Sequence, residues 1–244
     1  MAGRRKYEYE IVLFGATGFT GRLTAQYLAA HGGDDLRWAL AGRSQARLEA
    51  VRAELAQQHP ACAALPLLLA DSGDEASLQR VAHSAKVVVT TVGPYIEYGE
   101  PLVAACAEAG TDYLDLTGEP EFVDRMWLAH HDTAVASGAR IVHACGFDSI
   151  PHDLGVWFTV QQLPEGVPLT VEGFVRAGGT VSGGTWHSAI TALSRLRQYA
   201  DVARERRRRE DRPMDRTIGR THQRIGFNKL LGTWAVPFPS IAPQ

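Results

Sequence analysis

The segment Gly15-Ala16-Thr17-Gly18-Phe19-Thr20-Gly21 constrains this chain more than any other. It follows a predicted strand at Tyr9–Phe14 and opens a predicted helix at 20–31. Its first glycine permits a tight turn, its second lets the backbone approach a pyrophosphate, and its third allows close helix packing. The helix N-terminus adds free N–H groups and a positive dipole end. The segment predicts a dinucleotide-binding turn, and a purely structural turn is the alternative.

The first 150 residues alternate short apolar runs with amphipathic stretches, a pattern that indicates βαβ units and a parallel sheet. We predict an α/β Rossmann domain with a doubly wound sheet in the strand order 3-2-1-4-5-6. The expected strands are Tyr9–Phe14, Leu36–Ala41, Leu67–Ala70, Val87–Val92, Tyr113–Leu116 and Ile141–Ala144. The expected helices lie near 20–31, 45–58, 74–84, 99–109 and 121–137.

Beyond this region the pattern changes. The stretch Gly146–Gly155 is a turn-rich joint, so we divide the chain into a dinucleotide-binding domain at 1–150 and a partial α+β substrate domain at 151–244. In the second part we expect a strand at Val171–Arg176 and a long polar helix at about 185–210. The last 25 residues predict no closing element.

The residues after the second strand favour NADP(H) over NAD(H). An acidic residue in this position would bond a free ribose 2′-hydroxyl and repel a 2′-phosphate, but the chain has Arg43 and Ser44 there. A guanidinium and a hydroxyl suit a phosphate. The alternative is that Arg43 is a solvated surface residue.

Two further strand ends contribute candidate cofactor contacts. Asp71 and Ser72 follow the third strand, where the carboxylate could accept the adenine amino group or form a turn or helix cap. The residues Val92-Gly93-Pro94-Tyr95 follow the fourth strand, whose carboxyl end points into the ligand crevice of such a sheet. We expect Gly93 beside the nicotinamide ribose and Tyr95 on the substrate side, with aromatic packing as the alternative for Tyr95.

The joint between the two regions carries candidate catalytic residues. Asp148, His152 and Asp153 cluster there, and a histidine with acids nearby can deliver a proton. Together with Tyr95, we take Asp148 and His152 as the catalytic candidates. The alternative is a helix cap, with Asp153 as the N-cap residue. The chain has no Tyr-x-x-x-Lys pair, the usual acid pair of short-chain dehydrogenases.

Charge, cysteine content and hydropathy limit the possible partners and the cellular compartment. The net charge is −2, which gives no sign of a nucleic-acid partner, and the three cysteines form neither a disulfide framework nor a metal motif. No apolar stretch approaches a membrane span, so we expect a cytoplasmic protein. The run Arg206–Arg209 is a solvated helix face or a docking surface for an acidic carrier protein or an anionic membrane.

Four segments together resemble the saccharopine dehydrogenase family, in its enoyl-reductase-like branch. They are IVLFGATGFTG, WALAGRS, TTVGPYIEYGEPLVAACAEAGTDYLDLTGE and GFDSIPHDLG, and the resemblance covers residues 9 to about 195. It implies an NADP-binding Rossmann domain joined to an α+β domain that closes the site and often dimerises. Since such proteins continue well past residue 244, we expect the second domain to be incomplete.

The resemblance also implies an activity. It suggests an NADPH-dependent oxidoreductase that reduces an enoyl intermediate of lipid, glycolipid or polyketide synthesis, carried as an acyl chain. It places Gly15, Gly18 and Gly21 at the pyrophosphate and Arg43 and Ser44 at the 2′-phosphate. The alternative from another functional class is a non-enzymatic NADP(H)-binding sensor or interaction protein, because a fold does not fix a function.

Overall fold

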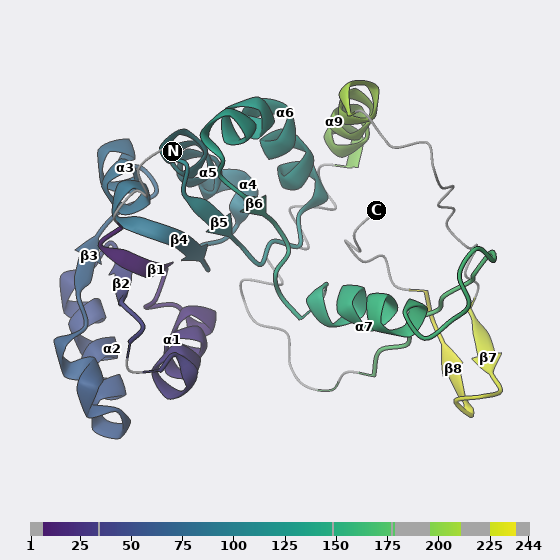
Figure 1. The fold of residues 1–244 in the computed structure, drawn as a ribbon, viewed down its shortest axis with the longest axis horizontal. Coiled ribbons are helices and arrows are strands. Elements are labelled where there is room, and N and C mark those ends of the chain that lie inside the picture. Colours follow the sequence, from purple (N-terminus) through teal and green to yellow (C-terminus); the bar gives the residue numbers. More distant parts are fainter. Residues whose placement is uncertain are drawn as a thin grey trace.

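The computed structural model describes residues 7–33, 35–147, 149–176, 178, 196–210 and 225–237. Six strands pair in parallel to form one sheet in the order β3-β2-β1-β4-β5-β6 (Figure 1). The strands are β1 Tyr9–Phe14, β2 Trp38–Gly42, β3 Leu67–Leu69, β4 Ala85–Thr90, β5 Asp112–Leu114 and β6 Ile141–Val142. The predicted α/β fold and strand order are confirmed.

Helices cover both faces of this sheet, because successive side chains of a strand point to opposite faces. Val12 and Phe14 of β1 belong to a core cluster that includes residues of α3, α5 and α6, whereas Leu13 belongs to a second cluster with α1 and α2. The helices are α1 Phe19–His31, α2 Gln45–Gln58, η1 Pro60–Ala64, α3 Glu75–Ser84, α4 Tyr95–Tyr98, α5 Glu100–Ala109, α6 Pro120–Ser137, α7 Ile150–Val160 and α9 Leu196–Arg209.

Element ends follow local capping more closely than apolar periodicity. Ser44 caps α2, which has the bounds predicted for it, and Asp74 caps α3 by accepting a hydrogen bond from the Ser77 N–H. The fourth strand ends at Thr90 rather than at the predicted Val92. The residues after it form the short helix α4, which the sequence did not predict.

The joint after β6 is helical, and the prediction of a turn-rich segment through Gly155 was wrong. Ser149 is the N-cap residue of α7, and Pro151 lies in its first turn, where the missing N–H costs no helical hydrogen bond. Asp153 therefore lies inside the first turn and is not the N-cap residue. None of the residues of α7 is buried against other described residues.

The region after α7 departs from prediction in two places. The predicted strand at Val171–Arg176 is absent: this stretch pairs with no described strand, and its side chains are exposed. A β-hairpin that the sequence did not predict joins β7 Gly226–Asn228 to β8 Thr233–Ala235. The Asn228 side chain accepts hydrogen bonds from the Leu230 and Leu231 N–H groups and so organises its turn.

Helix α9 forms the last part of the helix predicted at 185–210; residues 185–195 lie outside the described residues. It packs against α6, and Figure 1 places it beside that helix. Within the described ranges, no helix combines the length and apolar character needed to cross a membrane.

Candidate functional site

The carboxyl ends of β1 and β4 lie next to each other where the strand order reverses. The Thr91 N–H donates to the Phe14 carbonyl over 3.0 Å, and the Thr91 hydroxyl donates to the Gly15 carbonyl over 3.1 Å. These bonds fix the loop after β4 against the glycine-rich turn. In open α/β sheets, ligands bind outside such a reversal point.

The three glycines of the turn have different surroundings. Gly15 has a φ of +89°, and a Cβ there would lie 2.7 Å from Val92 Cγ2. A Cβ on Gly21 would lie 2.1 Å from the Gly15 carbonyl oxygen, so only glycine allows the helix to pack there. A Cβ on Gly18 would meet nothing nearer than 3.5 Å. Packing within the protein therefore requires glycine at 15 and 21, whereas at 18 a Cβ would make only an ordinary van der Waals contact.

A glycine at 18 that packing within the protein does not require fits a pyrophosphate bound close to the backbone. Gly18 is the N-cap residue of α1 and offers no side chain to the helix N-terminus, and the first turn of α1 contains no acidic residue. Thr17, Phe19 and Thr20 are exposed or half-buried along the same edge, whereas Ala16 is buried. An N-terminus without a side-chain cap and without negative charge suits an anionic ligand.

Arg43 lies exposed immediately after β2, and its guanidinium has no ion pair with any residue in the described part of the chain. The Ser44 hydroxyl accepts a hydrogen bond from the Arg47 N–H over 3.5 Å, as the N-cap residue of α2. The Ser44 hydroxyl proton remains available to a ligand. This arrangement suits an anion next to β2.

Asp71 and Ser72 are half-buried after β3. The Asp71 carboxylate accepts a hydrogen bond from the Gly73 N–H over 2.9 Å, and its own N–H donates to the Ser77 hydroxyl. The turn that the sequence left open as an alternative is therefore present. A contact of Asp71 with adenine stays a prediction.

Of the four candidates after β4, only Tyr95 is buried; Val92 and Pro94 are half-buried, and Gly93 is exposed. The Tyr95 hydroxyl donates to the Thr90 carbonyl over 3.1 Å, and its ring lies 5.8 Å from that of Phe122. Burial, and secondarily the Asp115 carboxylate, raise the pKa of Tyr95. The aromatic packing that the sequence left as an alternative is thus the contact that Tyr95 makes.

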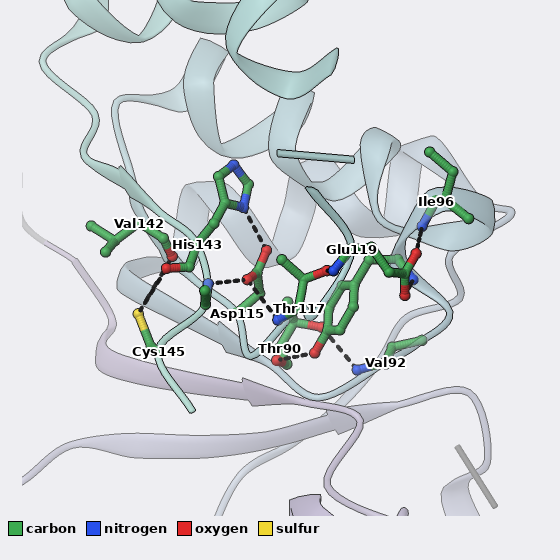
Figure 2. A network of polar contacts seen from close by, with 11 residues as sticks. Thr90, Val92, Ile96, Asp115, Thr117, Glu119, Val142, His143 and Cys145 are labelled. Carbon is green, nitrogen blue, oxygen red and sulfur yellow. Dashed lines mark hydrogen bonds and ion pairs between the residues drawn. The ribbon is translucent and has the colours of Figure 1, made fainter. Parts of the chain in front are cut away.

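The structure adds an acid–histidine pair that the sequence analysis did not find. Asp115 follows β5 and His143 follows β6, and His143 Nδ1 lies 2.6 Å from Asp115 Oδ2 (Figure 2). The Asp115 side chain is fully buried, and that of His143 is 12% exposed. The ring of His143 packs edge-on against Tyr113 and Phe122. Its second nitrogen, Nε2, bonds to none of the described residues.

The other carboxylate oxygen of Asp115 organises the backbone around this pair. Asp115 Oδ1 accepts hydrogen bonds from the Thr117 N–H over 3.0 Å and the Ala144 N–H over 2.9 Å. Ala144 has a φ of 58°, a left-handed conformation that costs an alanine free energy. The buried carboxylate therefore holds both the imidazole and a strained turn after β6.

A second buried carboxylate connects the same strand end with the loop after β4. Glu119, 5% exposed, accepts hydrogen bonds from the Tyr95 N–H over 3.0 Å and the Ile96 N–H over 2.8 Å. The Glu119 N–H in turn donates to the Thr117 hydroxyl over 3.1 Å. Figure 2 shows this network extending across the ends of three neighbouring strands.

The remaining catalytic candidates do not join this network. His152 lies in the first turn of α7, and its ring contacts that of Phe147 at 6.1 Å. No acidic side chain within the described ranges pairs with His152. Asp148 lies outside the described residues.

The arginine-rich run lies on α9, and its members have different contacts. The Arg206 guanidinium donates to Asp124 of α6 over 2.7 Å and to Glu210 over 3.1 Å, and it lies 5.3 Å from the Trp127 ring. Arg209 pairs with Glu205 at 2.8 Å. Arg207 and Arg208 are exposed. Arg206 is therefore engaged within the chain, and neither alternative from the sequence, a solvated helix face or a docking surface, holds for this residue.

Comparison with known proteins identifies the domain that contains this edge of the sheet. Residues 11–142 match the family model of the saccharopine dehydrogenase NADP-binding domain. The chain belongs to the saccharopine dehydrogenase family. Its six-stranded unit is an NADP-binding domain, as the resemblance implied.

Two relatives with a functional name come from mycobacteria. A trans-acting enoyl reductase of Mycobacterium bovis is 56% identical over 150 residues, which cover 62% of this chain and 35% of that protein. A Mycobacterium tuberculosis protein, whose name gives the same activity provisionally, is 50% identical over 202 residues, which cover 81% of this chain and 47% of that protein. The chain thus spans less than half the length of these relatives.

A solved structure supports the fold. Apo saccharopine dehydrogenase (L-Glu forming) from Saccharomyces cerevisiae aligns with a TM-score of 0.51 and 19% identity, over 63% of this chain and 31% of that one. The family match ends at residue 142, so Asp115 and Glu119 lie inside the NADP-binding domain and His143 directly follows it.

Proposed function

We propose that the protein is an NADPH-dependent reductase of an enoyl carbon–carbon double bond in a lipid or polyketide intermediate. The observation that carries this proposal is the glycine-rich turn at the reversal point of the sheet, where packing does not require the glycine at position 18 and a pyrophosphate would approach the backbone. The family's NADP-binding domain and the names of the mycobacterial relatives support it.

The chain's residues suggest how the dinucleotide is held. Residues 15–21 contact the pyrophosphate, with Gly18 at the closest approach. Arg43 and Ser44 contact the 2′-phosphate, because Arg43 is exposed and has no ion-pair partner in the described part of the chain. Asp71 and Ser72 lie on the adenine side, and residues 92–95 lie beside the nicotinamide ribose.

When bound, NADPH supplies a hydride for the substrate β-carbon. The electrons of the double bond then move to the α-carbon, which requires a proton. We assign this proton to His143, which transfers it from Nε2 while Asp115 holds Nδ1 and stabilises the charged ring. The support is the position of the pair at the carboxyl ends of β5 and β6, beside the loop after β4.

The sequence pointed to Tyr95, or to His152 with Asp148, as the proton donor. The Tyr95 hydroxyl already donates to a backbone carbonyl, and burial raises its pKa, so its proton is held more tightly than usual. His152 has no acidic partner among the described residues. These observations favour His143 as the proton donor and leave Tyr95 as a residue that lines the substrate side.

An acyl substrate of this kind travels on a carrier. We propose that the exposed Arg207 and Arg208 on α9 contact an acidic carrier protein, with an anionic membrane surface as the other candidate. Residues 151–244 contribute to a second domain that helps to close the site, and this domain is also where a homodimer would form.

The experiment that tests the cofactor assignment is a fluorescence titration with NADPH and NADH. We expect NADPH to bind at least about tenfold more tightly, a difference of about 1.4 kcal/mol. Arg43→Asp should abolish this preference. Arg80→Asp, the same charge change at an exposed position on α3, should retain it. If neither nucleotide binds, or if Arg43→Asp keeps the preference, the proposed cofactor assignment is wrong.

A further inference from the structure

We propose that Glu119 is a positioning residue for the nicotinamide half of the cofactor. This inference rests on the proposed function. The carboxylate of Glu119 accepts both the Tyr95 and the Ile96 N–H, which are backbone groups of the segment that follows β4. It thereby fixes the N-terminus of α4, into which the loop Val92–Pro94 leads from the reversal point of the sheet.

The burial of this carboxylate makes the contact unusual. Glu119 is 5% exposed, and buried carboxylates are rare unless they are well bonded, because removal from water is costly. Its two oxygens each accept one N–H of the first turn of α4, at 3.0 and 2.8 Å. Hydrogen bonds to an ionised group are stronger than those between neutral groups. Glu119 therefore holds the end of the loop where it enters α4, while the Thr91 bonds hold its beginning against the glycine-rich turn.

The place of the loop indicates which half of the dinucleotide it controls. The pyrophosphate lies at the N-terminus of α1, and the adenosine half extends toward β2 and β3. The nicotinamide half then extends toward β4, where residues 92–95 form the edge. Glu119 acts on that side alone, whereas Arg43 and Asp71 lie on the adenosine side.

The bonds of Glu119 also set the loop relative to the acid pair. The Glu119 N–H donates to the Thr117 hydroxyl, and the Thr117 N–H donates to Asp115, which holds His143 (Figure 2). Hydride and proton must reach neighbouring carbons of one substrate. One polar chain therefore places the nicotinamide side and the proton donor in a fixed relation.

The test compares two ligands on the same chain. NADPH contains the nicotinamide half, whereas adenosine 2′,5′-bisphosphate contains only the adenosine half with its 2′-phosphate. Glutamine at position 119 can accept only one of the two N–H bonds, because its amide group is a donor. We expect Glu119→Gln to weaken NADPH binding at least fivefold and to leave binding of the bisphosphate within twofold of wild type.

Glu121→Gln is the matched control. Glu121 is equally buried at the start of α6 and pairs with Arg125 on the same helix. The Glu121→Gln protein should therefore bind NADPH within twofold of wild type. Glu119→Ala, which removes both bonds, should weaken NADPH binding further, and thermal unfolding shows whether each variant is folded.

Equal weakening of both ligands by Glu119→Gln, or no change in either, would overturn this inference while leaving the proposed function intact. If the unchanged chain binds neither ligand, the proposed function fails and the inference fails with it.

Discussion

At the scale of single residues, the Asp115–His143 pair carries the proposed proton transfer. We expect His143→Gln to lower the rate of NADPH oxidation with crotonyl-CoA by about 100-fold or more, the usual contribution of a general acid. NADPH affinity, measured by fluorescence, should stay within about twofold, since this side chain acts on the proton and not on the nucleotide. Added imidazole should restore part of the rate.

The control for this variant is His83→Gln. His83 lies exposed on α3 and bonds to the Gln79 carbonyl of its own helix, so its loss should leave the rate unchanged. A His143→Gln protein that reduces crotonyl-CoA at the wild-type rate would remove His143 from the mechanism and return Tyr95 and His152 to consideration.

The reason why the sequence missed this pair is geometric. Asp115 and His143 are 28 residues apart and meet only because β5 and β6 are neighbours in the sheet. Both residues directly follow a strand in the structure, but the predicted strands Tyr113–Leu116 and Ile141–Ala144 extended past them and hid their place at the strand ends. Glu119 gave no signal in the sequence: it precedes α6, and its partners are backbone N–H groups that no residue type reveals.

At the scale of elements, the turn between β1 and α1 separates the requirements of the fold from those of the ligand. Gly21→Ala would place a Cβ 2.1 Å from the Gly15 carbonyl oxygen, a clash with backbone that α1 must move to relieve. We expect it to destabilise the protein by about 1–3 kcal/mol, as overpacking does. Thermal or urea unfolding measures this loss.

Gly18→Ala is the complementary change. Its Cβ would meet nothing nearer than 3.5 Å, so the free energy of unfolding should stay within about 1 kcal/mol of wild type. NADPH affinity should nevertheless fall at least about tenfold, because the methyl group occupies the space of the pyrophosphate. If Gly18→Ala binds NADPH normally, the turn is structural and the cofactor does not approach it.

The success of the sequence analysis also varied between elements. The turn at 15–21 and the parallel strands were predictable because glycine spacing and apolar periodicity are local properties. The hairpin β7–β8 and the unpaired stretch 171–176 were not predictable. A sequence with high β propensity forms a strand only where a partner strand is available. The start of α7 was placed too late, at Asp153, because Pro151 looks like a helix breaker but lies in the first turn.

At the scale of the whole molecule, α9 packs against α6 of the sheet domain, and the Arg206 guanidinium supplies the ion pair of that contact. Arg206 bonds to Asp124 and lies against Trp127, both on α6, with 23% of its side chain exposed. Burial would lower the pKa of Arg206, but its bonds to Asp124 and Glu210 outweigh that effect and raise it. The charge of Arg206 thus stabilises the contact between α9 and α6. The guanidinium groups of Arg207 and Arg208 are exposed to solvent.

The difference between the ion-paired Arg206 and the exposed Arg207 and Arg208 predicts different effects of charge reversal along α9. The double variant Arg207→Glu/Arg208→Glu should leave the melting temperature unchanged, because exposed charges contribute little to stability. Arg206→Glu should lower it by roughly 2–4 °C for each kcal/mol lost. Only the double variant should weaken binding to an acidic acyl carrier protein without loss of stability, and calorimetric titration at low salt measures that affinity.

Vesicles that contain phosphatidylserine distinguish the two candidate partners. If the double variant loses vesicle binding and keeps carrier binding, the exposed arginines serve a membrane surface and the substrate reaches the site by another route. If both affinities are unchanged, Arg207 and Arg208 form only a solvated helix face, and the acyl carrier must contact the protein elsewhere. In either case Arg206 remains a structural residue, because its partners lie within the chain.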